Sequence, residues 1–529
     1  MLTLQNLSYI HPNKDLLFDS INLTVNRHDK VALIGNNGVG KSTLLKIIAG
    51  KLPHTSGMLK TDTVPYYIPQ VFGQYNQLTI AQALGVAEKL TALHQILAGD
   101  FSEENYTLLD EDWTIEERCR VILTDWQLNK LDLFQKMDTL SGGQKTKVFL
   151  AGIAVHEPEL VLLDEPSNHL DVASRQLLYH FIENTKCTLI VVSHDRILLN
   201  GLNKVCELSK HGTTLYGGNY DFYAEQKQIA ANALADDIQN SEKALKKAKE
   251  KQQETMERQQ KLDARGKKKQ TNAGVARIMM NTLRNNAENS TARTKNTHIE
   301  KISDLSKELQ ELRSSSPDID KMKFGFDNSA LHQGKTLFMA KDMNFNYGLQ
   351  ELLWQENLSL RITSGERIAL KGNNGSGKTT LIKIILGDLP PSIGIVSRTS
   401  NKSIYIDQDY SLIDNNLQVY EQVQQFNHSA LQEHEIKIRL NRFLFTKDDW
   451  KKSCSALSGG ERMRLMLCCL TIDSHSPDLI ILDEPTNNLD IQNIEILTKA
   501  INAYQGTLVT VSHDEYFLEQ IRIDRIIEL

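Results

Sequence analysis

The 529-residue sequence lacks the marks of a membrane-spanning, secreted or zinc-binding protein. No apolar run approaches the roughly 18 residues that span a bilayer. The start, Met1–Ile10, alternates apolar and polar side chains like a strand and has none of the segments of a signal peptide. The six cysteines show no Cys-x-x-Cys spacing, so the sequence does not indicate a zinc site. We expect them to be buried thiols in a reducing cytosol. We therefore expect a cytoplasmic protein with no membrane domain in this chain.

Proline is absent between Pro166 and Pro317, and residues 224–264 also lack glycine. These 41 residues are rich in Ala, Lys, Glu and Gln, which favour a helix of about 60 Å. Further on, apolar residues recur at 3-4-3 spacing, which is typical of a helix-packing seam. The sequence therefore predicts that 224–331 is a charged helical hairpin linker with a basic turn; the apolar residues of the seam are Ile302, Leu305, Leu309 and Leu312.

The tip of this linker, residues 264–298, is strongly basic and has no aromatic side chain. It carries a formal charge of +7, whereas the whole protein has a net charge of −6. Cations without stacking aromatics suit contact with a phosphate backbone better than base stacking. A solvated, partly disordered linker is the alternative interpretation. The candidate RNA-contacting residues are Arg265, Lys267, Lys268, Lys269, Arg277, Arg284, Arg293 and Lys295.

The segments before and after the linker are copies of one module. A glycine-rich loop recurs with an offset of 337, a Leu-Ser-Gly-Gly motif with 317, and Leu-Asp-Glu-Pro and Val-Ser-His-Asp motifs with 319. The first copy thus has about 20 extra residues, which we place near 91–113 as a surface loop or short helical arm. We predict an α/β protein with two domains, 1–223 and 332–529, on either side of the linker.

Each glycine-rich loop follows a buried strand and precedes a helix, the context that a phosphate-binding G-x-x-x-x-G-K-[ST] loop requires. Its backbone N–H groups and lysine would hold phosphates, and its Ser or Thr would bind Mg²⁺. The candidates in the first copy are Gly35, Asn36, Asn37, Gly38, Val39, Gly40, Lys41, Ser42 and Thr43. Those in the second copy are Gly372, Asn373, Asn374, Gly375, Ser376, Gly377, Lys378, Thr379 and Thr380.

A second pair of motifs places two acids after an apolar strand in each copy. Asp164 and Asp483 suit a Walker B role toward Mg²⁺, and Glu165 and Glu484 are placed to act as general bases on water. A solvated strand end is the alternative, which the apolar runs before these residues disfavour.

The motifs together resemble those of ABC-type ATPases. By this resemblance Gln70 and Gln408 are Q-loop residues near Mg²⁺, 168–171 and 487–490 are D-loops, and His194 and His513 are switch histidines. Tyr347 would stack on adenine, with Tyr9 or His11 in the first copy. ABC modules pair head to tail within the monomer, so each signature motif would complete the other module's ATP site. The signature residues are Ser141, Gly142, Gly143 and Gln144, and Ser458, Gly459, Gly460 and Glu461.

Two such modules with a long charged linker resemble the ABC-F family of translation factors over essentially the full length. The segment 217–223, GGNYDFY, is similar to the element that leads into that family's linker. The resemblance implies an ATPase that binds the ribosome near the exit and peptidyl tRNA sites, contacts rRNA and tRNA, and regulates translation or protects the ribosome from antibiotics. A DNA-associated ABC ATPase and a transporter ATPase subunit are the alternatives.

Overall fold

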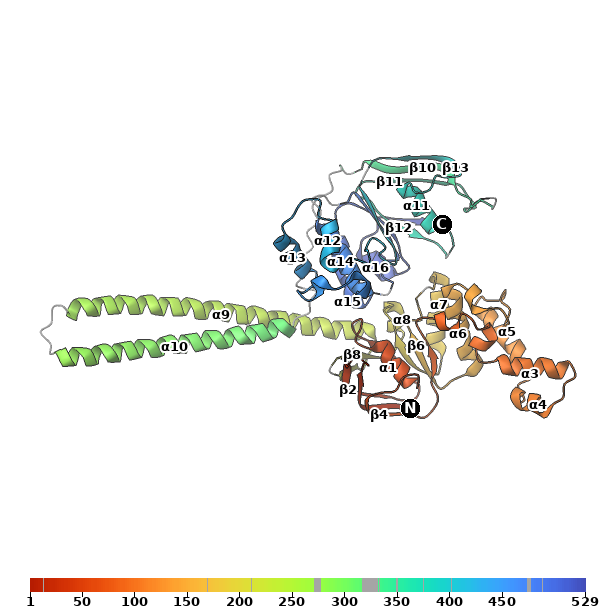
Figure 1. Ribbon diagram of the computed structural model, residues 1–529, viewed down its shortest axis with the longest axis horizontal. Helices are drawn as coiled ribbons and strands as arrows, with labels where there is room; N and C mark the ends of the chain where they lie inside the picture. Colours follow the sequence, from red (N-terminus) through yellow and green to blue (C-terminus); the bar gives the residue numbers. More distant parts are fainter. Residues whose placement is uncertain are drawn as a thin grey trace. The chain divides into compact units, whose positions relative to one another are not determined.

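We describe the chain from a computed structural model (Figure 1). It describes residues 1–12, 14–168, 170–210, 212–270, 277–315, 332, 334–348, 351–373, 375–400, 402–472, 477–487 and 489–529. Within the two long helices, the side chains at 259, 263, 266–270, 277–292, 294 and 314–315 are not described. Contacts divide the chain into two compact units, Met1–Tyr223 with Met322–Leu529, and Ala224–Lys321.

A six-stranded sheet forms the centre of the first ATP-binding module, in the order β5-β6-β7-β3-β8-β9. All its neighbouring strands are parallel except β8 and β9. β6 (LVLLD) and β7 (TLIVV) are buried along their whole length, as parallel strands covered on both faces must be. The strands are β3 (Lys30–Ile34), β5 (Tyr66–Ile68), β6 (Leu160–Asp164), β7 (Thr188–Val192), β8 (Lys204–Ser209) and β9 (Gly212–Tyr216).

A smaller antiparallel sheet, β2-β1-β4, packs its apolar face against helix α1 to form the core of this module. These strands are β1 (Leu2–Ile10), β2 (Leu16–Val25) and β4 (Ser56–Thr61). The helices are α1 (Lys41–Ile48), α2 (Ile80–Ala83), α3 (Ala87–Leu97), α4 (Glu103–Leu109), α5 (Ile115–Asp125), α6 (Gly142–His156), α7 (Val172–Asn184) and α8 (Arg196–Asn200).

The second module repeats this plan with a five-stranded parallel sheet, β14-β15-β16-β12-β17, and an antiparallel sheet, β11-β10-β13. Its strands are β10 (Thr336–Asn344), β11 (Leu358–Thr363), β12 (Arg367–Lys371), β13 (Ile393–Arg398), β14 (Ser403–Ile406), β15 (Leu479–Asp483), β16 (Thr507–Val511) and β17 (Arg525–Glu528). Its helices are α11 (Lys378–Leu386), α12 (Val419–Gln425), α13 (Glu433–Arg442), α14 (Gly459–Ile472), α15 (Ile491–Ala503) and α16 (Glu515–Gln520). The α/β fold with two ABC-type modules is confirmed.

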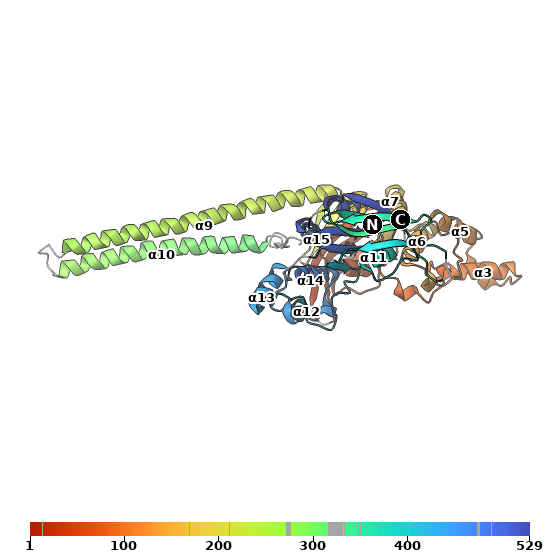
Figure 2. The same cartoon turned by 90° about the horizontal axis from the view of Figure 1, so that it is seen from above.

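Two long helices, α9 (Tyr220–Gln270) and α10 (Arg277–Ser315), form the hairpin and lie side by side in both views (Figures 1 and 2). The 51 residues of α9 correspond to about 77 Å. Arg313 Nη2 lies 2.6 Å from Glu242 Oε1 on α9, and this exposed ion pair joins the two helices close to the C-terminal end of α10. The basic turn was expected within the tip at 264–298, but most of this tip is helical, because α9 continues to Gln270 and α10 begins at Arg277.

Candidate functional site

Both glycine-rich loops join a buried central strand to the first turn of a helix. Gly40 and Gly377 precede α1 and α11 with φ of 103° and 94°, in the left-handed region that favours glycine. A Cβ at Gly40 would lie 2.8 Å from the side chains of Leu17 and Phe18, so glycine is also required there for space. These residues therefore fix a loop whose backbone N–H groups meet at a helix N-terminus, an arrangement suited to phosphate.

The lysine that follows each loop folds back over it. Lys41 Nζ donates to Gly35 O at 2.7 Å and to Asn36 O at 3.2 Å. Lys378 Nζ makes the same contacts with the carbonyls of the second loop, at 2.7 and 3.0 Å. Burial lowers the pKa of both lysines, and the nearby acidic side chains oppose this shift. Each ammonium group is thus a partly desolvated cation over the loop, which strengthens its interaction with an anion.

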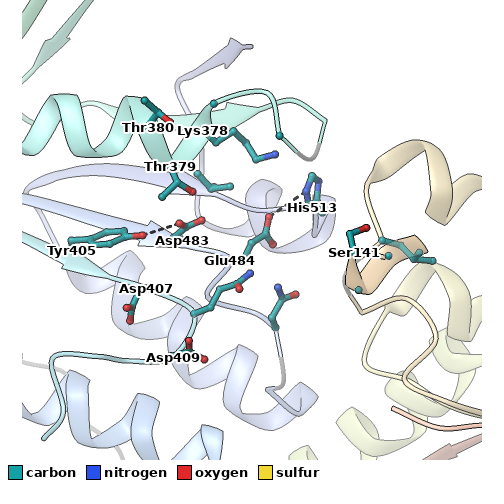
Figure 3. Close-up of a pocket in the computed structure, with 18 of the residues that line it drawn as sticks. Ser141, Lys378, Thr379, Thr380, Tyr405, Asp407, Asp409, Asp483, Glu484 and His513 are labelled. Carbon is teal, nitrogen blue, oxygen red and sulfur yellow. Dashed lines mark hydrogen bonds and ion pairs between the residues drawn. The ribbon is translucent and has the colours of Figure 1, made fainter. Parts of the chain in front are cut away.

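The two aspartates at the strand ends are each held by two hydroxyl groups. Ser42 Oγ donates to Asp164 Oδ1 at 3.0 Å, and Tyr67 Oη donates to Asp164 Oδ2 at 3.3 Å. In the second module Tyr405 Oη donates to Asp483 Oδ2 at 2.8 Å (Figure 3). Burial raises the pKa of both aspartates, and the hydroxyl hydrogen bonds oppose this rise. A hydroxyl beside a buried carboxylate is a donor set that fits Mg²⁺.

The glutamate after each aspartate sits in a strained turn. Glu165 has φ of 52° and Glu484 has φ of 48°, a conformation that costs a non-glycine residue about 1–3 kcal/mol. The turn is held because the Glu165 N–H donates to Val192 O at 2.8 Å, and the Glu484 N–H donates to Val511 O at 2.8 Å. Both strained turns direct a carboxylate toward the histidine that follows the neighbouring strand.

Each of these glutamates pairs with a switch histidine. Glu165 Oε1 lies 3.2 Å from His194 Nε2, and Glu484 Oε1 lies 3.4 Å from His513 Nε2. Burial raises the pKa of Glu165 to about 8 and that of Glu484 to about 7. Burial lowers the pKa of both histidines, that of His513 to about 4. Within the described part of the chain, Glu165 Oε1 and both oxygens of Glu484 have no hydrogen-bond partner. Acceptors with these pKa values suit proton abstraction near neutral pH.

A cavity lies over each glycine-rich loop, and the larger of these two, about 740 Å³, lies over the second loop and has a size typical of ligand pockets. Lys378, Thr379, Glu484 and His513 border it on one side, and Ser141 faces it from the other module (Figure 3). Of the predicted residues, it is lined by Ser141, Gly142, Gly143, Tyr347, Gly375, Gly377, Lys378, Thr379, Thr380, Gln408, Asp483, Glu484 and His513.

The second cavity, about 400 Å³, lies over the first glycine-rich loop. Ser458 from the second module is part of its lining. The other predicted residues that line it are His11, Asn37, Gly38, Gly40, Lys41, Ser42, Thr43, Gln70, Glu165 and His194. Each cavity thus combines the loop of one module with the signature serine of the other.

Several predicted residues line neither cavity. Val39 packs in the first core, and a Cβ at Gly460 would collide with Asn493, so these two residues have structural roles. Asp164 reaches the site through its bond with Ser42. Asn374 lies outside the described residues. The remaining residues of this kind are Gly35, Asn36, Gln144, Gly372, Asn373, Ser376, Gly459 and Glu461.

The adenine candidates differ between the modules. Tyr347 lines the larger cavity, is half exposed, and its Oη lies 2.7 Å from Thr380 Oγ1. In the first module His11 lines the cavity, whereas Tyr9 is buried in the core beside Phe18. Of the two open alternatives, His11 is therefore the one that the cavity exposes to a ligand.

Sequence reasoning placed Asp490 in a D-loop but did not predict the contacts that connect the two modules, and it missed Arg175. Asp490, the N-cap residue of α15, accepts a hydrogen bond from the Asn37 N–H at 2.7 Å with its Oδ2. Arg175 on α7 lines the larger cavity, and its Nη1 lies 3.5 Å from His513 O. The partners are more than 300 residues apart, and no periodicity or spacing indicates such a pair. Tyr67 and Tyr405 were also missed, although each precedes its Q-loop glutamine by three residues.

The basic side chains of the linker are described only in part. Arg265 on α9 and Arg293 and Lys295 on α10 are exposed. The side chains of Lys267, Lys268, Lys269, Arg277 and Arg284 lie outside the described residues. No helix in the part of the chain that the structure describes is long and apolar enough to cross a membrane.

Comparison with known proteins agrees with the two-module geometry. The model of the family described as "ABC transporter" matches residues 18–168 and 355–487. The ATP-binding protein YdiF of Bacillus subtilis is 32% identical over 97% of this chain and 78% of its own length. "ABC transporter F family member 5" of Arabidopsis thaliana is 30% identical over 99% of this chain and 74% of its own length. The chain belongs to the ABC-F family.

Solved structures of related fold support the same architecture for this ABC-F protein. The archaeal ribosome recycling factor aABCE1, crystallised with the stalk protein aP1, aligns with a TM-score of 0.61 at 18% identity. The alignment covers 99% of the ABC-F chain and 87% of the archaeal one. At this identity the likeness concerns the fold alone. The family match gives the ABC-F protein two ABC ATPase domains, a type of domain that in general binds ATP, normally with Mg²⁺, and hydrolyses it.

Proposed function

We propose that this ABC-F protein hydrolyses ATP at two composite sites, each completed by the signature motif of the other domain. The observation that carries this proposal is the shared lining of the cavities: Ser141 borders the loop of Lys378, and Ser458 borders the loop of Lys41. The bond from Asn37 to Asp490 adds a direct link between a phosphate loop and the opposite domain. ATP bound at these sites would then hold the two ABC domains of the monomer together.

The side chains of each site divide the work of hydrolysis. Lys41 and Lys378 offset charge on the β- and γ-phosphates. Glu165 and Glu484 accept a proton from the attacking water, since their raised pKa values lie near the operating pH. Nε2 of the adjacent histidine lies 3.2 Å from Glu165 Oε1 in the first site and 3.4 Å from Glu484 Oε1 in the second, so a neutral imidazole borders each carboxylate.

The residues present also fit a magnesium ion in each site. Ser42 with Asp164, and Thr379 with Asp483, supply the hydroxyl and carboxylate oxygens, and Gln70 and Gln408 line the same cavities. When bound, Mg²⁺ neutralises charge that develops on the phosphate oxygens. Tyr67 and Tyr405 orient the aspartates through their second oxygens. The hydrogen-bonded tyrosines thus act as supports for the metal ligands.

We further propose that the ABC-F protein binds the ribosome through its linker in the ATP-bound form and leaves after hydrolysis. Support comes from membership in the ABC-F family and from the charge of +7 over residues 264–298. The relative in fold, aABCE1, is named as a ribosome recycling factor. The basic helices would contact rRNA and tRNA near the exit and peptidyl sites, either to regulate translation or to protect the ribosome from antibiotics.

The rate of ATP hydrolysis, measured with and without polyanion, tests this proposal. Purified protein should be stimulated by ribosomes and much less by branched DNA at equal phosphate concentration and the same salt. The Lys41→Ala/Lys378→Ala variant serves as the matched control and should hydrolyse no ATP under either condition. If branched DNA stimulated hydrolysis and ribosomes did not, the partner would be DNA and not the ribosome, because a basic hairpin can bind either polyanion.

A further inference from the structure

The two signature serines differ in what their hydroxyl groups bind. In the second domain Ser458 Oγ donates to Glu461 Oε2 at 2.7 Å, and the Ser458 N–H donates to the same oxygen at 2.7 Å. Lys452 Nζ lies 2.9 Å from the other carboxylate oxygen, Oε1. Burial raises the pKa of Glu461, but the bonds from Lys452 and Ser458 outweigh it and keep the pKa below its ordinary value. Glu461 is therefore an ionised acceptor beside the serine.

The first domain has a neutral version of the same cap. The Ser141 N–H donates to Gln144 Oε1 at 2.9 Å, and the Gln144 N–H donates to Ser141 Oγ at 3.3 Å. Among the residues that the structure describes, the Ser141 hydroxyl donates to no acceptor. At the offset of 317 that relates the signature motifs, Gln135 takes the place of Lys452. Its Nε2 donates to Thr139 Oγ1 at 2.7 Å instead.

The duplicated modules thus differ by a paired exchange of Gln135 and Gln144 for Lys452 and Glu461. Because the exchange adds one positive and one negative charge, it leaves the formal charge of the region unchanged. Both versions also keep the helix cap, since Gln144 and Glu461 each accept from the N–H of their serine. What differs is the acceptor of the serine hydroxyl, because Ser458 Oγ donates to Glu461 and Ser141 Oγ donates to no described residue.

A serine hydroxyl has one proton to donate. The Ser141 hydroxyl can give it to a phosphate oxygen without breaking a bond to another described residue. The Ser458 hydroxyl must first release Glu461, and a hydrogen bond to an ionised acceptor is about twice as strong as a neutral one. An anion that approaches Ser458 therefore competes with the carboxylate for the same proton.

We propose that Lys452 and Glu461 form a positioning pair that makes the two ATP sites unequal. The site of Lys41, completed by Ser458, holds the γ-phosphate less tightly than the site of Lys378, completed by Ser141. The proposal rests on the composite sites described above. The expected difference in ATP affinity is on the order of tenfold, the factor that one hydrogen bond to a charged group supplies.

Equilibrium binding of radiolabelled ATP to the Glu165→Gln/Glu484→Gln protein tests the pair without turnover. The parent should show two binding steps separated on the order of tenfold. Adding Lys452→Gln/Glu461→Gln, which copies the first domain, should merge them by tightening the weaker step. The reciprocal Gln135→Lys/Gln144→Glu exchange should instead weaken the tighter step. Two steps that keep their separation in the Lys452→Gln/Glu461→Gln protein would overturn the proposal.

Single-site turnover separates this proposal from the assignment of composite sites. In a Glu484→Gln background only the Lys41 site hydrolyses ATP, and Lys452→Gln/Glu461→Gln should lower its KM while changing kcat little. In a Glu165→Gln background the same exchange should leave the KM of the Lys378 site unchanged. An effect on KM in the second background alone would mean that the signature motifs act within their own domains, which contradicts the composite sites. A lower kcat with unchanged KM would show a merely structural cap and overturn the positioning role.

Discussion

Asp490 carries two separable functions, and substituting it should reveal the energy of the contact between the domains. Its Oδ1 accepts from the Asn493 N–H at 2.8 Å and so caps α15, while its Oδ2 accepts from the Asn37 N–H at 2.7 Å. Loss of an N-cap costs about 1 kcal/mol. Loss of a hydrogen bond to a charged, buried group costs about 1.5–3 kcal/mol. Asp490→Ala removes both bonds, whereas Asp490→Ser keeps an oxygen that can cap the helix but does not reach Asn37.

The two variants should therefore differ in stability and resemble each other in ATP use. Thermal unfolding of Asp490→Ser should occur at a lower temperature than that of the parent, because the bond to Asn37 is lost, and that of Asp490→Ala at a still lower temperature, because the helix cap is lost as well. In a Glu484→Gln background, which leaves only the Lys41 site active, both variants should need about tenfold or more ATP for half-maximal turnover, since 1.4 kcal/mol corresponds to a factor of ten. If Asp490→Ser kept the parent's ATP dependence, the bond to Asn37 would contribute nothing and our reasoning would be refuted.

Three further predictions concern other parts of the molecule. Ellman's reagent at pH 8 should find one fast-reacting thiol, Cys187, because the other five thiols are buried and burial raises the pKa of Cys206 to about 12; several fast thiols would contradict this packing. Arg196 of the first domain stacks on Tyr516 of the second, with its guanidinium carbon 4.0 Å from the ring centroid, and lysine cannot stack in the same way. Arg196→Lys should therefore weaken ribosome stimulation of ATP hydrolysis severalfold. Unchanged stimulation would show that this contact does not link ribosome binding to ATP hydrolysis. Changing the three lysines at 267–269 to Gln should lower ribosome affinity and reduce its salt dependence; an unchanged salt slope would mark the tip as a linker only.

Local features of the fold were predictable from the sequence because short patterns determine them. The run LVLLD before Glu165 indicated a strand covered on both faces, and β6 is buried throughout. The glycine-rich loop between a strand and a helix indicated the phosphate-binding geometry now seen at Gly40 and Lys41. The absence of proline and glycine indicated α9, although the helices run further toward the tip than expected.

Other features depend on packing that short patterns do not encode. Tyr9 and His11 could not be separated because β1 has register shifts on both sides of Tyr9, which break the alternation of inward and outward residues. Gln144 and Glu461 were predicted to bind nucleotide with their motif, but both side chains cap their helices. The pair of Asn37 and Asp490 spans 453 residues of sequence, so only the folded chain reveals it.

Retention of an ATP-locked variant on ribosomes tests the central claim most directly. Glu165→Gln/Glu484→Gln removes both proton acceptors while leaving the phosphate loops and their lysines intact. With ATP and Mg²⁺, this variant should sediment with ribosomes through a sucrose cushion, whereas the parent should be released as it hydrolyses ATP. Adding Lys41→Ala/Lys378→Ala should abolish the retention, because the closed form then lacks its ligand. If the locked variant sedimented with ribosomes no more than the parent, the account of an ATP-dependent ribosome-binding protein would be contradicted.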